Sequence, residues 1–401
     1  MSCYLDTKDK KSCFGCESCA NACVKSAIAM VADADGFRYP EIDKSSCVDC
    51  GACRKACPSI NMPIRFGDGK YVFGGYHKDY DVRFESTSGG AFSAVVEAFC
   101  DANYVIFGAE SRGLQVFHTY ITDKSEIYKF RKSKYVQSVM GSSYVDAKKF
   151  LLDGKKVLFS GTPCQIAGLK AFLDNVCQDN LLTVEVVCEG VPSPLYINKY
   201  EKHLSAKYGR KVKSIDYRYT GRSIFTKGKW DFEQMKICFE GSDETIVKDR
   251  WFNPFWSVWL QHLMSRPSCY ECPFACLDRV ADITLGDLWG VHKYCPELYG
   301  HNVGSSLVVC NTEKAKSVFN IAQKFMYGHE LNLAEAIKYQ GPMRRHLPDN
   351  PHRSDAMADL RSNMDYKSIN RKWAHRPTLN LLLQKYIWGN RQKVFIKTIF
   401  K

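Results

Sequence analysis

Short apolar runs alternate with amphipathic segments along the chain from residue 71 onward. Runs rich in β-branched and aromatic residues, typical of buried strands, cover residues 71–76, 104–108, 114–122, 157–160 and 181–188. A Gly/Ser turn at 86–90 and the Gly-Thr-Pro-Cys stretch at 161–164 each lead into an amphipathic helix. Strands that alternate with helices favour an open, largely parallel sheet, so this part of the chain is predicted to be an α/β domain.

Cysteine dominates the pattern of the first sixty residues. Two runs share the spacing C-x2-C-x2-C-x3-C: Cys13, Cys16, Cys19 and Cys23, then Cys47, Cys50, Cys53 and Cys57. Three thiolates on one tight loop can hold three corners of a four-iron cubane, and in two-cluster ferredoxins the fourth cysteine of each run ligates the other cluster. Cluster one would therefore take Cys13, Cys16, Cys19 and Cys57, and cluster two would take Cys47, Cys50, Cys53 and Cys23.

Zinc is the alternative occupant, because soft thiolates bind it and C-x2-C pairs are common in zinc ribbons. Zinc binding does not readily account for two full runs that each have a distal fourth cysteine. We therefore interpret the segment as a bacterial-type two-cluster 4Fe–4S ferredoxin domain. Val24 follows the first run where Pro58 follows the second, and this departure alters a turn but not the ligands.

The remaining cysteines, out of 19 in 401 residues, also need an explanation. The chain starts without the apolar stretch of a signal peptide, and no apolar run reaches the roughly 18 to 20 residues that span a bilayer. We therefore expect a cytoplasmic protein, in which a disulfide framework is disfavoured. Five isolated cysteines are expected to be buried structural residues: Cys100, Cys177, Cys238, Cys295 and Cys310. The histidines, for example His118 and His262, have no ligand-like spacing.

The formal charge of +13 is concentrated at the C-terminal end. Residues 366–401 contain nine basic residues and no acidic one, interleaved with aromatic and aliphatic side chains and interrupted by Pro377. Two interpretations fit this segment. It is either an interfacial helix on anionic lipid, which would give peripheral contact with the inner membrane face, or a helix packed on the body with a solvated basic face. No nucleic-acid recognition module accompanies the charge, so no nucleic-acid partner is expected.

Four more cysteines occupy positions typical of metal ligands. Cys164 and Cys188 stand at the ends of predicted strands, Cys269 and Cys272 form a C-x2-C pair, and Cys276 follows in helical register. A zinc pair or chance would also account for the C-x2-C, and the spacing does not show that the strand-end cysteines converge on it. Neither the dinucleotide-binding glycine motif nor the P-loop motif occurs in the chain.

Seven segments, taken in order, resemble the coenzyme F420 hydrogenase/dehydrogenase beta-subunit family. They lie within about residues 70–340 and comprise residues 86–90, 133–138, 159–170, 188–194, 266–274, 281–290 and 304–307. The resemblance implies one FAD beside a four-iron cluster in the α/β domain, and it implies these ligands for the third cluster: Cys164, Cys188, Cys269 and Cys272. Cys276 would be a substitute ligand or a bystander. Known relatives oxidise or reduce F420, feed formate dehydrogenases and sulfite reductase modules, or reduce a chlorophyll derivative, and many bacterial relatives lie near exopolysaccharide genes.

The residue chemistry of these segments agrees with a flavin. A Gly89-Gly90 turn before a helix would let backbone N–H groups approach a diphosphate, and Lys134 could neutralise phosphate or reduced flavin. Taken alone, these would be an ordinary turn and a solvated lysine, and the aspartates of 281–290 could equally cap turns. The flavin or substrate candidates are Ser88, Gly89, Gly90, Lys134, Tyr135, Gln137, Ser138, Thr162, Asp282 and Asp287. No catalytic residue is assigned.

The predicted fold is α+β, with five segments. They are a ferredoxin domain at 1–60, a linker at 61–70, a flavin-binding part at 71–155, a part with the third cluster at 156–340, and a basic helical extension at 341–401. We expect an FAD-dependent iron–sulfur oxidoreductase that exchanges electrons between an organic substrate or F420 and a ferredoxin-like partner, with exopolysaccharide biosynthesis as a candidate setting. The alternatives are a non-catalytic electron-transfer subunit of a larger redox complex and a scaffold with vestigial redox sites.

Overall fold

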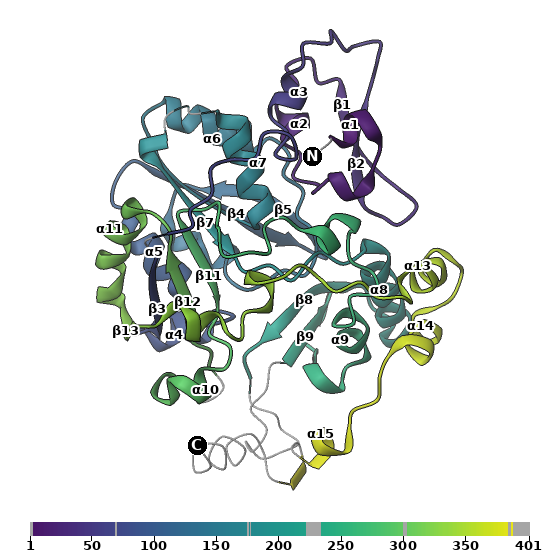
Figure 1. Ribbon diagram of the computed structural model, residues 1–401. Helices are drawn as coiled ribbons and strands as arrows, with labels where there is room; N and C mark the ends of the chain where they lie inside the picture. The colour runs from purple at the N-terminus through teal and green to yellow at the C-terminus, as the bar shows by residue number, and fades with distance from the viewer. Residues whose placement is uncertain are drawn as a thin grey trace.

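The computed structural model describes residues 3–68, 70–174, 176, 178–221, 234–299, 303–383 and 386–387. Three parts are visible in Figure 1: the cysteine-rich N-terminal region at the top, an eight-stranded sheet flanked by helices, and a three-stranded sheet with helices of its own. The N-terminal region rests on the helices above the large sheet. The molecule is therefore α+β, as the sequence predicts.

The large sheet has the strand order β13-β3-β12-β11-β7-β6-β4-β5. Its strands are β3 (Tyr71–His77), β4 (Tyr104–Arg112), β5 (Gln115–Ile121), β6 (Lys156–Gly161), β7 (Leu181–Val186), β11 (Ile283–Asp287), β12 (Ser306–Cys310) and β13 (Met326–Glu330). The five apolar runs are confirmed as β3 to β7. The last run ends as a strand at Val186, so Cys188 lies two residues beyond it.

This sheet is mixed, which corrects the prediction of a mostly parallel one. The neighbours β4, β6, β7 and β11 are parallel. The other neighbouring pairs are antiparallel: β5 with β4, β12 with β11, β3 with β12, and β13 with β3. The apolar runs correctly indicate β3 to β7, but strand direction depends on how the chain connects the strands. β5 turns back on β4, and β12 and β13, which follow residue 300, pair antiparallel with β11 and β3.

Helices cover both faces of the large sheet. On one face, α5 (Ala91–Phe99) and α11 (Glu313–Ala322) pack against each other and share one buried apolar core with the strands. On the other face, α6 (Ser143–Leu152) and α7 (Pro163–Leu173) share a second core with β4 and β6. Phe107 and Phe159 stack within it at 5.1 Å between ring centroids. The shorter helices are α4 (Tyr80–Phe84), α10 (Val291–Tyr294) and α12 (Leu333–Ile337).

The small sheet has the order β10-β9-β8 and forms its own core with nearby helices. Its strands are β8 (Val212–Tyr219), β9 (Gln234–Phe239) and β10 (Thr245–Asp249). The helices are α8 (Pro194–Tyr208), α9 (Pro254–Trp259), α13 (Arg353–Arg361) and α14 (Tyr366–Trp373).

The first part of the basic tail belongs to this small-sheet core. Tyr366 and Ile369 of α14 are buried, and Lys372 forms an ion pair with Asp359 at 2.7 Å. This part agrees with a helix packed on the body. After α15 (Leu379–Leu383), the basic residues 385, 391, 393, 397 and 401 lie outside the described residues, so peripheral membrane contact stays a prediction. Among the described residues, no helix has both the length and the apolar composition to cross a bilayer.

The N-terminal region consists of short elements around the cysteine loops. They are α1 (Tyr4–Thr7), η1 (Lys10–Ser12), α2 (Ser18–Asn21), β1 (Ile28–Ala32), β2 (Arg38–Ile42) and α3 (Ala52–Lys55), with β1 and β2 antiparallel. The predicted linker is attached to the body. Phe66 exchanges backbone hydrogen bonds with Arg279 at 2.8 and 3.2 Å, and Arg65 donates to the carbonyl of Pro273. The linker therefore helps to fix the N-terminal region on the body.

A buried hydrogen-bond network ties β5 to the start of α7. His118 is 7% exposed, and its Nε2 lies 2.9 Å from the carbonyl oxygen of Ser160, which can only accept. Nε2 therefore carries the proton, and Nδ1 accepts from the Ser138 hydroxyl at 2.8 Å. Burial lowers the pKa of His118 to about 4. His118 is thus a structural group, held neutral.

We predict that His118 makes folding stability sensitive to mild acid. The folded pKa is depressed, so below about pH 6.5 the unfolded chain binds a proton that the folded chain does not. The contribution is complete above about pH 6.5 and is lost as pH falls toward 4. Between about pH 6.5 and 5.5 the protein should lose roughly 1 kcal/mol of stability that His118→Gln does not lose.

Urea midpoints from pulse proteolysis at the two pH values measure this difference. The exposed His352→Gln variant is the control and should keep the full pH slope. An unchanged slope in His118→Gln would contradict the assignment of the acid sensitivity to His118.

Candidate metal centres

Four cysteines far apart in the sequence converge beside the large sheet; we call them the third thiol set. They are Cys164, Cys188, Cys269 and Cys272. β6 and β7 are parallel neighbours, so the residues that follow them meet at one edge of the sheet. Cys164 lies in the first turn of α7 and Cys188 just past β7, while η6 (Pro267–Glu271) carries Cys269.

The electrostatics of the third thiol set reflect this proximity. Burial raises the pKa of Cys188 well above its usual value, and the negative charges of the other three thiolates raise it further. Burial likewise raises the pKa of Cys269 to about 11 and that of Cys272 to about 12, with Cys164 contributing to both. Four half-buried thiols that oppose each other's ionisation are stabilised as thiolates by a bound cation, which fits an iron–sulfur centre.

The position of Cys164 follows from the local sequence. Thr162 caps α7 in a capping box with Gln165, and Pro163 occupies the first helical position. The Thr162 hydroxyl lies 3.2 Å from the Cys164 sulfur. Thr162, which was predicted to bind flavin, therefore contacts a candidate metal ligand. Cys276 instead donates to the carbonyls of Pro273 and Asp278, at 3.4 and 3.3 Å.

The first thiol set lines a single cavity in the N-terminal region. It comprises Cys13, Cys16, Cys19 and Cys57, the four expected ligands of cluster one. A fifth thiol, Cys3, lines the same cavity, is 2% exposed, and has its sulfur 3.7 Å from the Cys57 sulfur. Sequence analysis did not single out Cys3 because it lies outside both spacing motifs.

The second thiol set faces solvent. It comprises Cys23, Cys47, Cys50 and Cys53, of which Cys47 and Cys50 are exposed and the other two half-buried. Apolar neighbours share this exposure: Val24 is 85% and Val48 is 59% exposed. This end of the N-terminal region therefore offers both the thiols and an apolar surface to the outside.

One buried arginine lies between the first and third thiol sets. Arg266 is 0% exposed, and it donates to the carbonyl of Cys13 at 2.9 Å and to the sulfur of Cys13 at 3.4 Å. Its guanidinium also lies 4.4 Å from the ring centroid of Tyr39. Its positive charge opposes the rise in the pKa of Cys164 and Cys269 that burial causes. Arg266 therefore acts electrostatically on both thiol sets.

Close backbone contacts fix this arrangement. A Cβ added to Gly168 of α7 would lie 3.0 Å from Cβ and 3.1 Å from Sγ of Cys16. The Ser18 hydroxyl is 2.9 Å from the Gly168 carbonyl. On the cluster loop, Gly15 has φ +68°, and a Cβ there would lie 2.5 Å from the Gln137 amide and 2.8 Å from the Arg266 guanidinium. Glycine at both positions permits the approach.

The glycines and the serine expected to bind flavin make close contacts within the protein. A Cβ on Gly89 would lie 2.5 Å from the backbone oxygen of Gly75 and the backbone nitrogen of Ser306, so the sheet rather than a ligand requires this glycine. Gly90 has φ +84°, caps α5, and would meet Cβ of His77 at 3.0 Å. Ser88 donates to the Ser305 carbonyl at 2.8 Å.

The other polar candidates already have protein partners. Gln137 donates to the carbonyls of Phe14 and Gly15, while Ser138 belongs to the His118 network. Lys134 donates to two backbone carbonyls, and burial lowers its pKa to about 7. Tyr135 packs edge-on against Trp256 and Trp259.

The two aspartates bind separate partners. Asp282 accepts from Thr183 and Thr312, and Asp287 pairs with Arg218 at 2.6 Å. The thiol sets therefore fit four-iron clusters. The polar groups of the flavin candidates have partners within the protein, and flavin binding by these residues stays a prediction. The sequence of a short glycine motif, or of an isolated polar residue, does not show whether its hydrogen-bonding groups face a ligand or other parts of the protein.

Comparison with known proteins agrees with the two parts of the chain. Residues 154–333 match the family model for the C terminus of the coenzyme F420 hydrogenase/dehydrogenase beta subunit. Residues 12–61 match the model described as "4Fe-4S dicluster domain". Among solved structures, a chain of the F420-reducing NiFe hydrogenase complex from Methanosarcina barkeri is similar at 19% identity and a TM-score of 0.43, over 68% of this chain and 90% of that chain. A search of curated proteins finds no match.

Metal analysis should separate the third thiol set from the other two. Anaerobically prepared protein should contain about twelve iron and about twelve acid-labile sulfide per chain, as expected for three four-iron clusters. Cys164→Ser should lose between about one and about four iron, since the third cubane is left with three of its four thiolates. Cys238→Ser, which removes a half-buried thiol outside all three sets, should lose none. About eight iron in the unmodified protein and in Cys164→Ser alike would remove the third cluster.

Proposed function

Because the chain joins a 4Fe–4S dicluster domain to the C-terminal domain of the coenzyme F420 hydrogenase/dehydrogenase beta-subunit family, we propose that it is an iron–sulfur electron-transfer protein with three four-iron clusters in series. Along this series, the cluster at the first thiol set lies between the cluster at the third set and the cluster at the second set. The observation that carries the proposal is the contact of one buried guanidinium with the first set and its electrostatic action on the third.

Proximity supports the first step of this series. Cys16 of the first set and Cys164 of the third lie close enough that the charge of one raises the pKa of the other. Cys16 also packs directly on Gly168 of α7, one turn beyond Cys164. Adjacent clusters exchange single electrons readily, so electrons would pass directly between the cluster in the body and the first cluster of the N-terminal region.

Exposure supports the second step. Cys19 of the first set and Cys53 of the second are within electrostatic reach of each other, and the second set is the one that faces solvent. A redox protein partner would dock there, over the exposed Val24 and Val48. Transient redox complexes use small interfaces of this kind. The direction of electron flow depends on the cluster potentials.

The finer hypothesis is that the chain also binds FAD and is itself a dehydrogenase or reductase. This hypothesis is supported by the match of residues 154–333 to a family that is named for hydrogenases and dehydrogenases of coenzyme F420. Clusters accept one electron at a time, so a two-electron organic substrate would need such a cofactor. The competing hypothesis is a subunit that only transfers electrons for a separate catalytic polypeptide. An exopolysaccharide setting stays a prediction.

Release of flavin decides between these two hypotheses. If the chain is a flavoenzyme, denaturing the anaerobically prepared protein should release about one FAD per chain, and its absorption should bleach with a two-electron donor. Protein with full iron content but without flavin would assign the chain to the electron-transfer subunits. Because iron content is measured on the same sample, loss of cofactor during preparation is detected.

Replacing Arg266 should lower the reduction potentials of two clusters and leave the third unchanged. Removing a buried positive charge disfavours the extra electron, so in Arg266→Gln clusters one and three should each shift by roughly −50 to −100 mV, on the order of 1–2 kcal/mol. Arg266→Lys keeps the charge and should shift them less. An EPR-monitored redox titration measures all three potentials.

The half-buried Arg54 provides the matched control. Its charge acts on Cys53 of the second set, so Arg54→Gln should move cluster two and leave the other clusters unchanged. If Arg266→Gln folds with full iron content but shifts a single cluster, the proposed adjacency of clusters one and three is wrong.

A further inference from the structure

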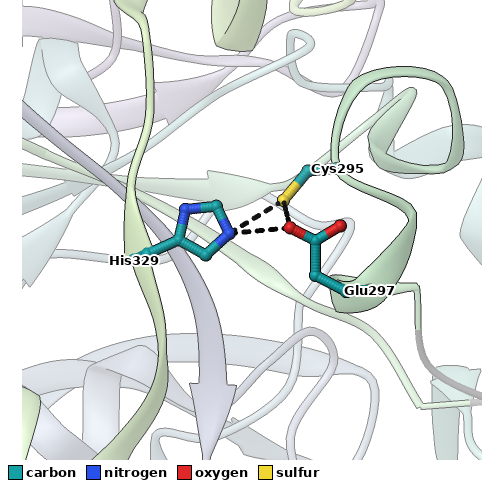
Figure 2. A group of neighbouring side chains, drawn as sticks. All are labelled: Cys295, Glu297 and His329. Carbon is teal, nitrogen blue, oxygen red and sulfur yellow. Dashed lines mark hydrogen bonds and ion pairs between the residues drawn. The ribbon is translucent and has the colours of Figure 1, made fainter.

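Three side chains meet beside the edge of the large sheet, away from the thiol sets. Cys295 lies between α10 and η7 (Pro296–Leu298), Glu297 lies in η7, and His329 lies in the edge strand β13. Figure 2 shows the sulfur, one carboxylate oxygen and the imidazole Nε2 pointing toward one another. The Cys295 sulfur is 3.1 Å from Glu297 Oε1 and 3.2 Å from His329 Nε2, and the latter two atoms are 2.9 Å apart.

The second nitrogen of the imidazole is already engaged. Nδ1 of His329 lies 3.0 Å from the carbonyl oxygen of Glu330, which can only accept, so Nδ1 carries a proton. A neutral ring then presents a lone pair at Nε2 toward the sulfur and the carboxylate. Three electron-rich atoms at this separation are held together by protons or by a metal ion. An Nδ1–H bond to a backbone carbonyl is also the usual way in which a metal-binding histidine is oriented.

We propose that Cys295, Glu297 and His329 bind one divalent transition-metal ion, with zinc as the best match. Thiolate, imidazole and carboxylate are the three ligand types of zinc sites. A tetrahedral zinc ion would set these ligand atoms about 3.3 to 3.7 Å apart, a few tenths of an ångström more than the present separations. The described residues elsewhere group no other three such ligand atoms within 4.8 Å.

Burial indicates how the ion would sit. Cys295 is 2% exposed and anchors the inner side of the site, whereas the side chains of His329 and Glu297 are 49% and 53% exposed. The two exposed ligands can adjust their positions, and solvent reaches the fourth coordination position. Three protein ligands and a water molecule would complete the tetrahedron.

This site is distinct from the iron–sulfur centres. In the sheet, β3, β12 and β11 separate β13 from β7, which leads to Cys188. Its mixed donor set of sulfur, nitrogen and oxygen differs from the four thiolates of a cubane. The ion would tie η7 to the edge strand β13. Cys295 stands isolated in the sequence because its partner His329 lies 34 residues away, so spacing alone predicts only a buried structural thiol.

Zinc binding to the fully iron-loaded protein tests the proposal. Equilibrium dialysis with zinc alone should give about one zinc per chain in the unmodified protein and in the Cys238→Ser control. Cys295→Ser and His329→Ala should each bind zinc at least about 100-fold more weakly, since loss of an outer-shell partner already costs about 10- to 100-fold. The proposal would be overturned if the unmodified protein bound no zinc, or if both variants bound zinc as tightly as the unmodified protein does.

X-ray absorption at the zinc edge gives an answer that does not depend on the variants. The expected first shell has one sulfur at about 2.3 Å and nitrogen or oxygen atoms at about 2.0–2.2 Å. A shell of sulfur alone would show that zinc occupies a thiol set and would also overturn the proposal. Absence of zinc from this site would leave the electron-transfer function untouched, because the iron content and the cluster potentials are measured separately.

Discussion

A guanidinium buried without access to water must find all its partners inside the protein, and Arg266 finds them on both sides of a domain contact. It donates to the carbonyl and sulfur of Cys13 and to Gln137, and its face lies over Tyr39. Leaving such a charge unpaired would cost several kcal/mol. The N-terminal region is therefore held where Cys13 and Arg266 meet. That constraint also brings the first and third thiol sets together.

The rest of the interface is adapted to the same close approach. Gly168 leaves room where α7 meets Cys16 of the loop, and Gly15 leaves room where the loop meets Gln137 and Arg266. Phe14 packs edge-on against Phe274 at 5.2 Å between ring centroids. The segment between the two parts is fixed through Phe66 and Arg279. Electron transfer in series depends on a fixed distance between centres, so a rigid contact of this kind serves the proposed function better than a flexible tether would.

Local patterns allowed much of this structure to be predicted. The strands β3 to β7 and the two cysteine runs depend on neighbours a few residues apart, and spacing is sufficient for both. The convergence of Cys164, Cys188, Cys269 and Cys272 depends instead on strand order and loop paths, which spacing does not encode. For the same reason the sequence did not reveal Cys3, Arg266 or the pairing of Cys295 with His329.

The flavin candidates show why a role cannot be assigned from a motif alone, and their binding of flavin stays a prediction. Gly89 and Asp282 occur in segments that resemble a cofactor-binding family, yet sheet packing explains Gly89 and hydrogen bonds to Thr183 and Thr312 explain Asp282. A motif identifies residue types, but the same types close turns and cap strands. Their role depends on whether their polar groups have partners within the protein, and only the three-dimensional contacts show this.

The proposed electron path requires three clusters in series, with cluster one in the middle. The most direct measurement is a crystal structure of anaerobically prepared protein with anomalous differences recorded on both sides of the iron edge. Three iron sites are expected: a middle one held by Cys13, Cys16, Cys19 and Cys57 beside Arg266, one neighbour held partly by Cys164, and the other held partly by Cys53. An iron-free third thiol set, or a first set remote from Arg266, would contradict the proposed path.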